Sequence, residues 1–198
     1  MKTFNNFISE AKEKSATFTF GRFNPPTTGH EKLVKKLLSV GRGTDVLLFS
    51  SHSNDKRKNP LNHRDKVKYL KKFFGKIVVD ANVRTVFEIC NFLQEKKYVN
   101  INMVVGSDRV KEFEMLITKY NGVKARHGFY KFKNINIISA GERDPDADDV
   151  SGMSASKMRE FAEKGDFEGF KDGVPSKGKN LAKKLYDDIR KGMGINEG

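Results

Sequence analysis

The sequence has no tryptophan, a single cysteine and only five prolines among its 198 residues. One cysteine excludes an internal disulfide, and Cys90 falls in an apolar helical pattern typical of a reduced core residue in a cytoplasmic protein. No apolar run approaches the roughly 18 residues that a membrane-spanning helix needs, and no signal-peptide core is present. The sequence therefore predicts a soluble, unexported chain with one domain of ordinary size.

Negative charge is also scarce, since 38 Lys and Arg residues face 25 Asp and Glu residues and give a formal net charge of +13. This balance favours polyanions or small phosphorylated ligands and does not choose between them. The sequence lacks the aromatic pattern of RNA-recognition modules. It also lacks the residue spacing of zinc fingers and of other metal-ligand sets. We therefore expect no resident metal site.

Short apolar runs alternate with amphipathic stretches along the chain. Strands are expected at residues 16–20, 44–50, 76–80, 100–105 and 134–139, and helices at 29–40, after Asn62, at 84–95, at 110–118, after Ser154 and at 179–191. The alternation predicts an α/β fold, a Rossmann-like five-stranded parallel sheet with C-terminal helices. The expected divisions are an amphipathic arm at 1–14, the main domain at 15–165 and a helical segment at 166–198. Ligands of such sheets bind at the carboxyl ends of the strands.

The stretch 21–30, GRFNPPTTGH, follows the first expected strand. Two prolines preset the loop, and Gly21 and Gly29 allow a close approach of the backbone. The helix that begins near Gly29 would direct free N–H groups and its positive dipole end at the loop, and His30 lies in its first turn. These features predict a phosphate site that contains an imidazole.

A second motif, MSASKMR at residues 153–159, opens the helix after the last strand. Ser154 and Ser156 place hydroxyl groups at a helix start, where free backbone N–H groups also lie. Lys157 and Arg159 add positive charge. An ordinary serine cap beside a basic surface explains the motif equally well when it is taken alone.

Together the two stretches resemble the signatures of the nucleotidyltransferase superfamily, namely (H/T)xGH at 27–30 and an ISSTxxR-like element at 154–159. The resemblance covers roughly residues 16–165 and implies the fold of the HIGH-signature nucleotidyltransferases. It implies His30, Lys157 and Arg159 as catalytic residues. The nucleotide-binding residues that it implies are Gly21, Arg22, Phe23, Thr27, Gly29, His30, Gly106, Asp108, Ser154, Ser156 and Arg159. Gly106 and Asp108 belong to a turn after the fourth expected strand, which a simple cap explains as well.

The loop at residues 51–61 carries Ser51-His52 and Asn59-Pro60-Leu61 and is followed by Arg64. This order resembles archaeal-type nicotinamide-mononucleotide adenylyltransferases, in which the opening motif also begins with GRF. The resemblance implies Asn24, His52, Asn59 and Arg64 as substrate-binding residues. Solvated lysines in a basic loop are the plain alternative, and His63 and His127 are expected to be surface histidines.

The resemblance implies transfer of AMP from ATP to a phosphorylated acceptor, with nicotinamide mononucleotide as the favoured acceptor, and release of pyrophosphate. Mg²⁺ would arrive with the nucleotide. A CTP-dependent cytidylyltransferase and a pantetheine-phosphate or flavin adenylyltransferase remain alternatives. A nucleic-acid-binding module is a second alternative, through the lysines and arginine at 56–58, 66, 68, 71 and 72. The aspartates at 144, 146, 148 and 149 are expected to form a solvated loop.

The N-terminal arm is similar in style to the N-termini of proteins of large tailed bacteriophages. Such an origin would place the protein in the host cytoplasm. The sequence predicts no membrane contact and leaves the oligomeric state open. The resemblance explains neither the arm nor the basic segment 119–133.

Overall fold

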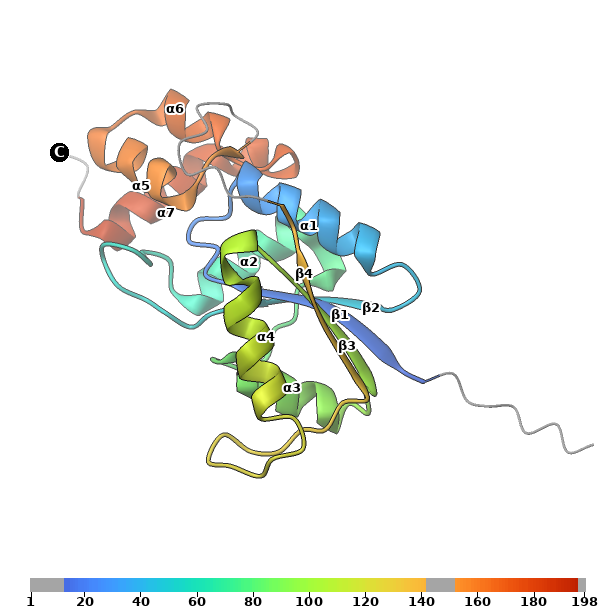
Figure 1. Cartoon of the computed structure of the whole chain (residues 1–198). Coiled ribbons are helices and arrows are strands. Elements are labelled where there is room, and N and C mark those ends of the chain that lie inside the picture. Colours follow the sequence, from blue (N-terminus) through green and yellow to red (C-terminus); the bar gives the residue numbers. More distant parts are fainter. Residues whose placement is uncertain (1–12, 142–151, 196–198) are drawn as a thin grey trace, which may run out of the picture.

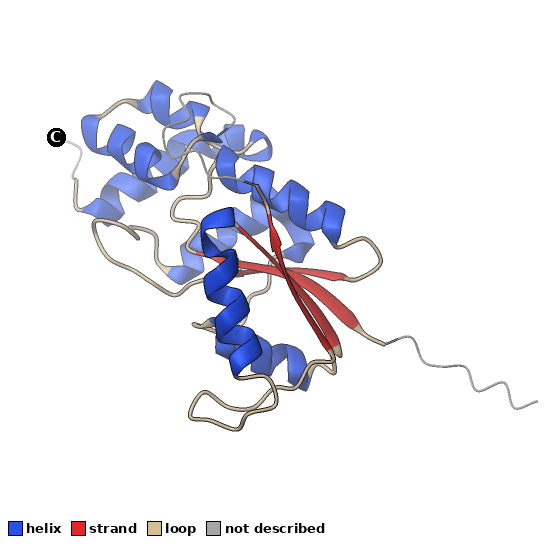
Figure 2. Ribbon diagram, in the orientation of Figure 1, coloured by secondary structure: helices blue, strands red, loops and turns tan. Residues whose placement is uncertain are grey.

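The computed structural model of the chain describes residues 13–141 and 152–195. Figure 1 traces these residues, and Figure 2 shows strands enclosed by helices. The elements follow one another in this order: β1 (Ser15–Gly21), α1 (Thr28–Val40), β2 (Asp45–Ser50), α2 (His63–Phe74), the 3₁₀ helix η1 (Gly75–Ile77), α3 (Val86–Glu95), β3 (Asn100–Val105), the 3₁₀ helix η2 (Ser107–Arg109), α4 (Val110–Lys119), β4 (Asn134–Ser139), α5 (Ala155–Lys164), α6 (Phe167–Asp172), the 3₁₀ helix η4 (Ser176–Leu181) and α7 (Ala182–Met193).

The four strands form one parallel sheet in the order β2-β1-β3-β4. The predicted α/β fold with a parallel sheet and C-terminal helices is therefore confirmed. In this order β1 is central, and the chain turns to one side of it for β2 and to the other side for β3 and β4. The reversal of direction at β1 creates the crevice in which sheets of this kind bind ligands.

The fifth strand that the sequence predicts at residues 76–80 is not a strand among the described residues. Gly75 has a positive φ of 73° and begins η1, so the 3₁₀ turn takes up the residues through Ile77. Only Val78 then lies alongside β2, where it makes an isolated parallel bridge to Leu48, and the Val79 N–H donates to the Leu48 carbonyl at 2.9 Å. The prediction of five strands is wrong in this respect, because the turn leaves too few residues to extend the ladder.

Helices cover both faces of the sheet. On one face Phe18, Ile101 and Met103 pack against α3 and α4 in the largest cluster of buried side chains. On the other face Val34 of α1 and Leu70 of α2 close a smaller cluster around the β2 side chains. Ala16, Phe18 and Phe20 of β1 belong to the first cluster, and Thr17 and Thr19 alternate with them along the strand.

A third cluster joins the C-terminal helices to the sheet domain. Tyr69 and Phe73 of α2 pack with Met158 of α5 and with Leu185 and Ile189 of α7. In Figure 1 the helices α5, α6 and α7 gather at one end of the molecule. The Tyr69 hydroxyl group donates to the Asp188 carboxylate at 2.6 Å, which ties α7 to α2 directly. The C-terminal helices therefore share a core with the helix that follows β2.

Two other predictions concern residues at the margins of the described chain. The arm at 1–14 lies outside the described residues except for its last two positions, and so do the aspartates at 144, 146, 148 and 149. The helix expected at 179–191 is a 3₁₀ turn, η4, followed by α7, which begins only at Ala182. Within residues 13–141 and 152–195, every helix is too short or too polar to span a bilayer.

The tie between Tyr69 and Asp188 gives a stability prediction. Replacing Tyr69 with Phe keeps the ring but removes a hydrogen bond to a charged group, so we expect the free energy of unfolding to fall by about 1–2 kcal/mol. Tyr120→Phe is the matched control, because the Tyr120 hydroxyl group forms no hydrogen bond with the described residues. Urea unfolding of both variants checks the prediction, and equal losses of stability would contradict it.

Candidate active site

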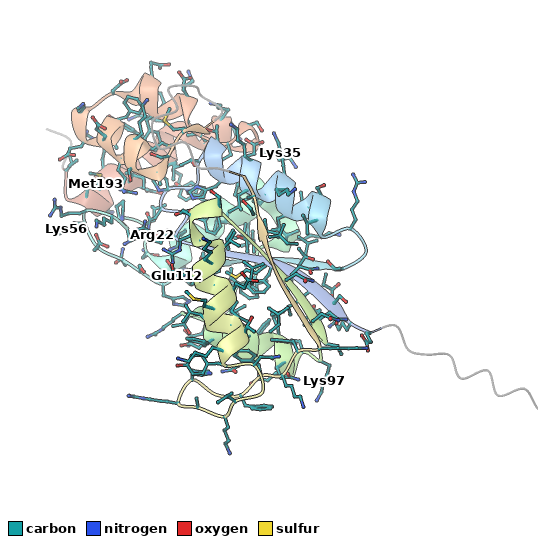
Figure 3. The ribbon with its side chains drawn as sticks, viewed as in Figure 1. Arg22, Lys35, Lys56, Lys97, Glu112 and Met193 are labelled. Carbon is teal, nitrogen blue, oxygen red and sulfur yellow. The ribbon has the colours of Figure 1, made fainter. Side chains whose placement is uncertain are left out.

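The predicted motifs meet at the carboxyl ends of the strands. Residues 21–30 follow β1, the loop 51–61 follows β2, and Gly106 follows β3. Figure 3 shows Arg22 beside the end of β1, on the same side of the view as Lys56 of the loop 51–61. The topology therefore brings together loops that lie far apart in the sequence, at the edge where parallel sheets bind ligands.

The loop before α1 holds His30 in one tautomer. The Thr27 N–H donates to His30 Nδ1 at 3.1 Å, and the Thr27 hydroxyl oxygen lies 3.0 Å from the same nitrogen. Because a backbone N–H can only donate, Nδ1 acts as the acceptor and the neutral imidazole carries its proton on Nε2. Thr27 also caps α1, since its hydroxyl group accepts from the His30 N–H at 3.2 Å. The arrangement makes the imidazole a hydrogen-bond donor through Nε2.

Phe23 supports His30 and does not face a ligand. The Phe23 side chain is only 1% exposed, and its ring lies 4.8 Å from the imidazole, centroid to centroid. A Cβ atom on Gly21 would lie 3.1 Å from the Phe23 ring, so the small residue at 21 makes room for this packing. Burial under His30 leaves only the backbone of Phe23 for the predicted nucleotide contact, which stays a prediction.

The N–H groups that the sequence predicts to be free at the start of α1 are largely used within the fold. The Thr28 N–H donates to the Gly173 carbonyl at 2.9 Å, and the His30 N–H is bound to Thr27. A Cβ atom on Gly29 would lie 3.0 Å from the Met153 carbonyl oxygen, so the helix start packs directly against the start of α5. Anion binding at this place must consequently depend mainly on side chains.

Asn24 connects two loops of the site. Its side chain is 1% exposed and makes two bonds to the backbone of Leu61, donating from Nδ2 to the carbonyl at 2.8 Å and accepting from the N–H at 3.0 Å. Both ends of the amide are therefore used within the fold, and the substrate contact of Asn24 stays a prediction. Asn24 fixes the end of the loop 51–61 to the loop after β1.

Arg159 joins the second motif to the first. Its Nη1 donates to the Asn24 carbonyl at 2.7 Å, and its Nη2 donates to the Ser156 hydroxyl oxygen at 3.0 Å. Ser154 caps α5 by accepting from the Lys157 N–H at 3.1 Å. Lys157 itself lies half-buried in the first turn of that helix. The two motifs, more than 120 residues apart, therefore form one site.

Lys66 is the functional residue that the sequence reasoning missed. Its side chain is fully buried, and its Nζ donates to the Ser51 carbonyl at 2.5 Å. Burial, and then the charge of Arg22, lower the pKa of Lys66 from its ordinary value of 10.5 to about 8. The signal in the sequence was spacing, because Lys66, Leu70 and Phe73 follow an i, i+4, i+7 pattern that places the lysine on the buried face of α2.

Arg22 extends the positive charge of the site. Its guanidinium group is exposed, and its charge lowers the pKa of Arg159, for which burial is the larger cause, as well as the pKa of Lys66. Three cations therefore interact by repulsion, and Asp55 opposes the shift at Arg159 only in part. Such a cluster favours an anionic ligand.

The loop 51–61 is closed by a pair of polar residues. Asp55 and Asn59 exchange backbone hydrogen bonds, and Asn59 Nδ2 donates to the Asp55 carboxylate at 2.5 Å. The N–H of Lys58, followed by Asn59, holds the pKa of Asp55 at about 2. The amide nitrogen of Asn59, a predicted substrate contact, is therefore used to close the loop.

Three polar atoms on this loop are buried and have no hydrogen-bond partner among the described residues. These atoms are Ser51 Oγ, His52 Nε2 and Asn59 Oδ1. Buried polar atoms are normally paired with protein or with ordered water, so these three atoms have unused hydrogen-bonding capacity at the end of β2. They leave His52 and the Asn59 side-chain oxygen able to contact a substrate.

His52 stacks on His63, with ring centroids 3.6 Å apart and an angle of 17° between the rings. Burial and then the neighbouring His52 lower the pKa of His63, because two stacked imidazolium ions would repel each other. His63 is thus a half-buried partner of His52, which corrects its prediction as a surface histidine. Arg64 is exposed on α2, and Lys66 is the cation of this helix that reaches the loop.

Gly106 and Asp108 lie where β3 ends. Gly106 has extended dihedral angles and begins η2, and Asp108 is exposed. No hydrogen bond or ion pair to the Asp108 carboxylate is formed within the described part of the chain. Asp108 therefore remains available at the β3 side of the crevice. His127, in contrast, lies in the segment 119–133, where its ring is half-buried and stacks on Phe87.

A family model matches most of this sequence, and a solved structure resembles its fold. The sequence model of the cytidylyltransferase-like family matches residues 18–161, which include both motifs. Among solved structures, a protein of Vibrio parahaemolyticus provisionally named as a nicotinate-nucleotide adenylyltransferase has a TM-score of 0.51 at 14% sequence identity. The alignment covers 85% of this chain and 98% of that chain.

A comparison with curated proteins finds no match. The predicted bacteriophage origin and cellular location stay predictions, because none of these relatives bears on them. The family match spans well over half of the sequence and includes the residues that meet at the carboxyl ends of β1 and β2. The chain therefore belongs to the cytidylyltransferase-like family, whose members transfer nucleotidyl groups.

Proposed function

We propose that the protein transfers AMP from ATP to a small phosphorylated acceptor, nicotinamide mononucleotide being the preferred candidate, and releases pyrophosphate. The observation that carries the proposal is the group of three cations, Arg22, Lys66 and Arg159, around one end of the sheet. The buried ammonium group of Lys66 donates only to a backbone carbonyl and has no carboxylate partner among the described residues. A triphosphate supplies the missing negative charge.

The reaction is an in-line displacement at the α-phosphorus. A phosphate oxygen of the acceptor forms a bond to this phosphorus, and the bond to the oxygen that bridges the α- and β-phosphates breaks. The acceptor phosphate is already ionised near neutral pH, so no general base is required. The protein positions the two phosphates and stabilises the charge that develops.

Each side chain then has a specific task. His30 donates from Nε2 to the α-phosphate, since its other ring nitrogen is bound to Thr27. Arg159, Lys157 and the serine hydroxyl groups of α5 hold the departing pyrophosphate. Arg22 binds phosphate on the side of the loop 51–61, and the buried ammonium group of Lys66 adds positive charge beneath this loop. His52 and Asn59 of the loop are assigned to the acceptor.

Mg²⁺ is expected to enter with the nucleotide. Among the described residues, no three His, Cys, Asp or Glu side chains gather closely enough to hold a metal ion. The donor set of the site is cationic, which fits the triphosphate and not the ion itself. Mg²⁺ would thus be bound mainly by substrate phosphates, where it neutralises charge on the pyrophosphate.

The base and the acceptor are tested by pyrophosphate release in parallel reactions. ATP with nicotinamide mononucleotide is the expected pair, and each substrate alone should release nothing. The family match keeps CTP with a phosphorylated alcohol as the second candidate, and release from that pair alone would replace the proposal. Nucleotide binding by calorimetry without release from either pair would reject both acceptors.

Replacing His30 tests the assignment of the imidazole. We expect His30→Ala to lower kcat by about 10²–10³, because one donor to the developing charge is lost. His127→Ala is the control, since that ring stacks on Phe87 in the segment 119–133 and should leave kcat unchanged. Near-normal turnover in His30→Ala, with the melting temperature retained, would contradict the role.

Lys66 should give the reaction an alkaline limit. With a pKa of about 8, its ammonium group loses the proton above that pH, so kcat/KM for ATP should fall as the pH rises past about 8. In Lys66→Arg the guanidinium group stays charged to a pKa above about 12, so the decline should move to higher pH. An unchanged profile in this variant would show that Lys66 does not cause the decline.

The same pKa shift affects stability. The folded chain binds the Lys66 proton less tightly than the unfolded chain, in which the pKa is 10.5. The buried charge therefore lowers the free energy of unfolding at neutral pH, and this cost disappears as the pH rises from about 8 toward 10.5. A bound phosphate would restore the pKa and offset the cost.

Asn24 should act on substrate binding through the loop 51–61. We expect Asn24→Leu to raise KM for the acceptor at least about tenfold, because the Leu61 backbone loses both partners and the loop is released. Asn121→Leu is a matched control. Asn121 makes the same pair of bonds to the Phe132 backbone, at 3.0 Å and 2.8 Å, in the segment 119–133.

Both Asn variants lose stability, so unfolding alone does not distinguish them. The two variants are distinguished by measuring KM and kcat separately, because only Asn24→Leu should raise the KM for the acceptor. An acceptor KM that rises equally in the two variants would assign Asn24 a purely structural role.

A further inference from the structure

Residues 119–133, named here the basic turn, connect α4 to β4. The connection reaches the amino end of β4, whereas the candidate active site lies at the carboxyl ends of the strands. In Figure 1 the basic turn projects at the end of the molecule opposite the C-terminal helices. Nothing in the nucleotidyl-transfer reaction uses this part of the chain.

The basic turn is held in a defined shape by its own side chains. Tyr130 is fully buried, and its hydroxyl group donates to the Ile117 carbonyl at 2.8 Å. Asn121 binds both backbone groups of Phe132, and a backbone pair between Ala125 and Gly128 closes the tip. The basic turn therefore has a shape that is fixed by internal hydrogen bonds.

This rigid turn exposes positive charge together with an aromatic ring. Phe129 is 46% exposed, and the side chains of Lys124, Arg126 and Lys131 around it are also exposed. The sequence from 115 to 141 contains no Asp or Glu, so no carboxylate within this stretch neutralises these cations. Tyr130 is buried between two exposed residues, Phe129 and Lys131. The Phe129 ring and the Lys131 ammonium group therefore lie on the same outward side of the segment.

We propose that the basic turn binds single-stranded nucleic acid, with Phe129 stacking on a base and Lys124, Arg126 and Lys131 contacting the phosphate backbone. Exposed aromatic rings beside cations are the usual elements of such sites, and stacking is worth about 1–3 kcal/mol per base. An acidic protein partner fits less well. Stable protein interfaces bury about 800 Å² on each side around an apolar centre, and the turn offers only Phe129 and Val123 as exposed apolar side chains.

Three members of the lysine-rich set that the sequence suggested for nucleic acid are buried or paired, whereas those at 56–58 and 72 are exposed. Lys66 is buried, Lys68 pairs with Asp65 at 3.0 Å, and Lys71 pairs with Asp80 at 2.9 Å. Charges that are already paired or buried contribute little to backbone binding. The basic turn keeps its cations exposed beside an aromatic ring, and so we prefer it to this set as the candidate surface.

The test measures binding of fluorescein-labelled single-stranded DNA and RNA of about 20 nucleotides to the full chain, by anisotropy at several salt concentrations. The triple variant K124Q/R126Q/K131Q should bind at least about tenfold more weakly and reduce the slope of log K against log salt by about 2. F129A should bind about tenfold more weakly with an unchanged slope, because stacking depends little on salt. Excess ATP should not compete.

The control variants remove the same number of positive charges, and one exposed apolar side chain, from α1. K32Q/K35Q/K36Q changes three exposed lysines on α1, and L38A truncates a side chain that is 47% exposed. These control variants should bind oligonucleotides as wild type does. The basic-turn variants should release pyrophosphate as wild type does. Equal loss in both triple variants would overturn the proposal. Binding of a polyglutamate peptide without any binding of oligonucleotides would overturn it in favour of an acidic partner.

Discussion

The pair of hydrogen bonds between the Asn24 side chain and the Leu61 backbone is the constraint on which the site depends. The Asn24 side-chain amide pairs with both the N–H and the carbonyl of Leu61, which would otherwise be left unpaired. The carbonyl of the same residue accepts from Arg159, so one position connects the loops after β1 and β2 to the start of α5. Each loop alone is a short turn with several accessible shapes. Joined through Asn24, they have one arrangement, and cations from all three can be held at fixed distances from a phosphate.

Holding these cations together opposes folding, and the surrounding apolar clusters offset this cost. Lys66 and Arg159 lose hydration through burial, and both are repelled by Arg22. Tyr69 and Phe73 pack α2 against the C-terminal helices, and this packing holds the helix that carries Lys66. A site of this kind is least stable when no anion is bound, because only a ligand supplies the negative charge. Preorganised charge of this sort costs no rearrangement at the moment of reaction.

The sequence predicted the position of the site better than its details. Strand-and-helix alternation, with the rule that ligands bind at the carboxyl ends of parallel strands, placed both motifs at one edge of the sheet, as the structure has them. The side-chain roles were harder, because they depend on partners distant in sequence. Asn24 was predicted to contact substrate, and its pairing with Leu61 was missed because Leu61 lies 37 residues away. Lys66 was grouped with neighbouring lysines as a possible nucleic-acid contact, although its helical spacing favoured burial. The fifth strand failed because a local 3₁₀ turn at Gly75 competed with sheet pairing.

A parallel sheet has two functionally different ends, and this chain places positive charge at both. Loops at the carboxyl ends enter the crevice beside β1, so their cations converge and some become buried. The connection into β4 lies at the other end, and the cations of the basic turn are exposed there. Converging cations suit a compact triphosphate, whereas dispersed cations beside an exposed ring suit an extended polyanion. The net charge of +13 is therefore better understood as two local arrangements than as one diffuse property. Because the sheet separates them, either can change without altering the geometry of the other.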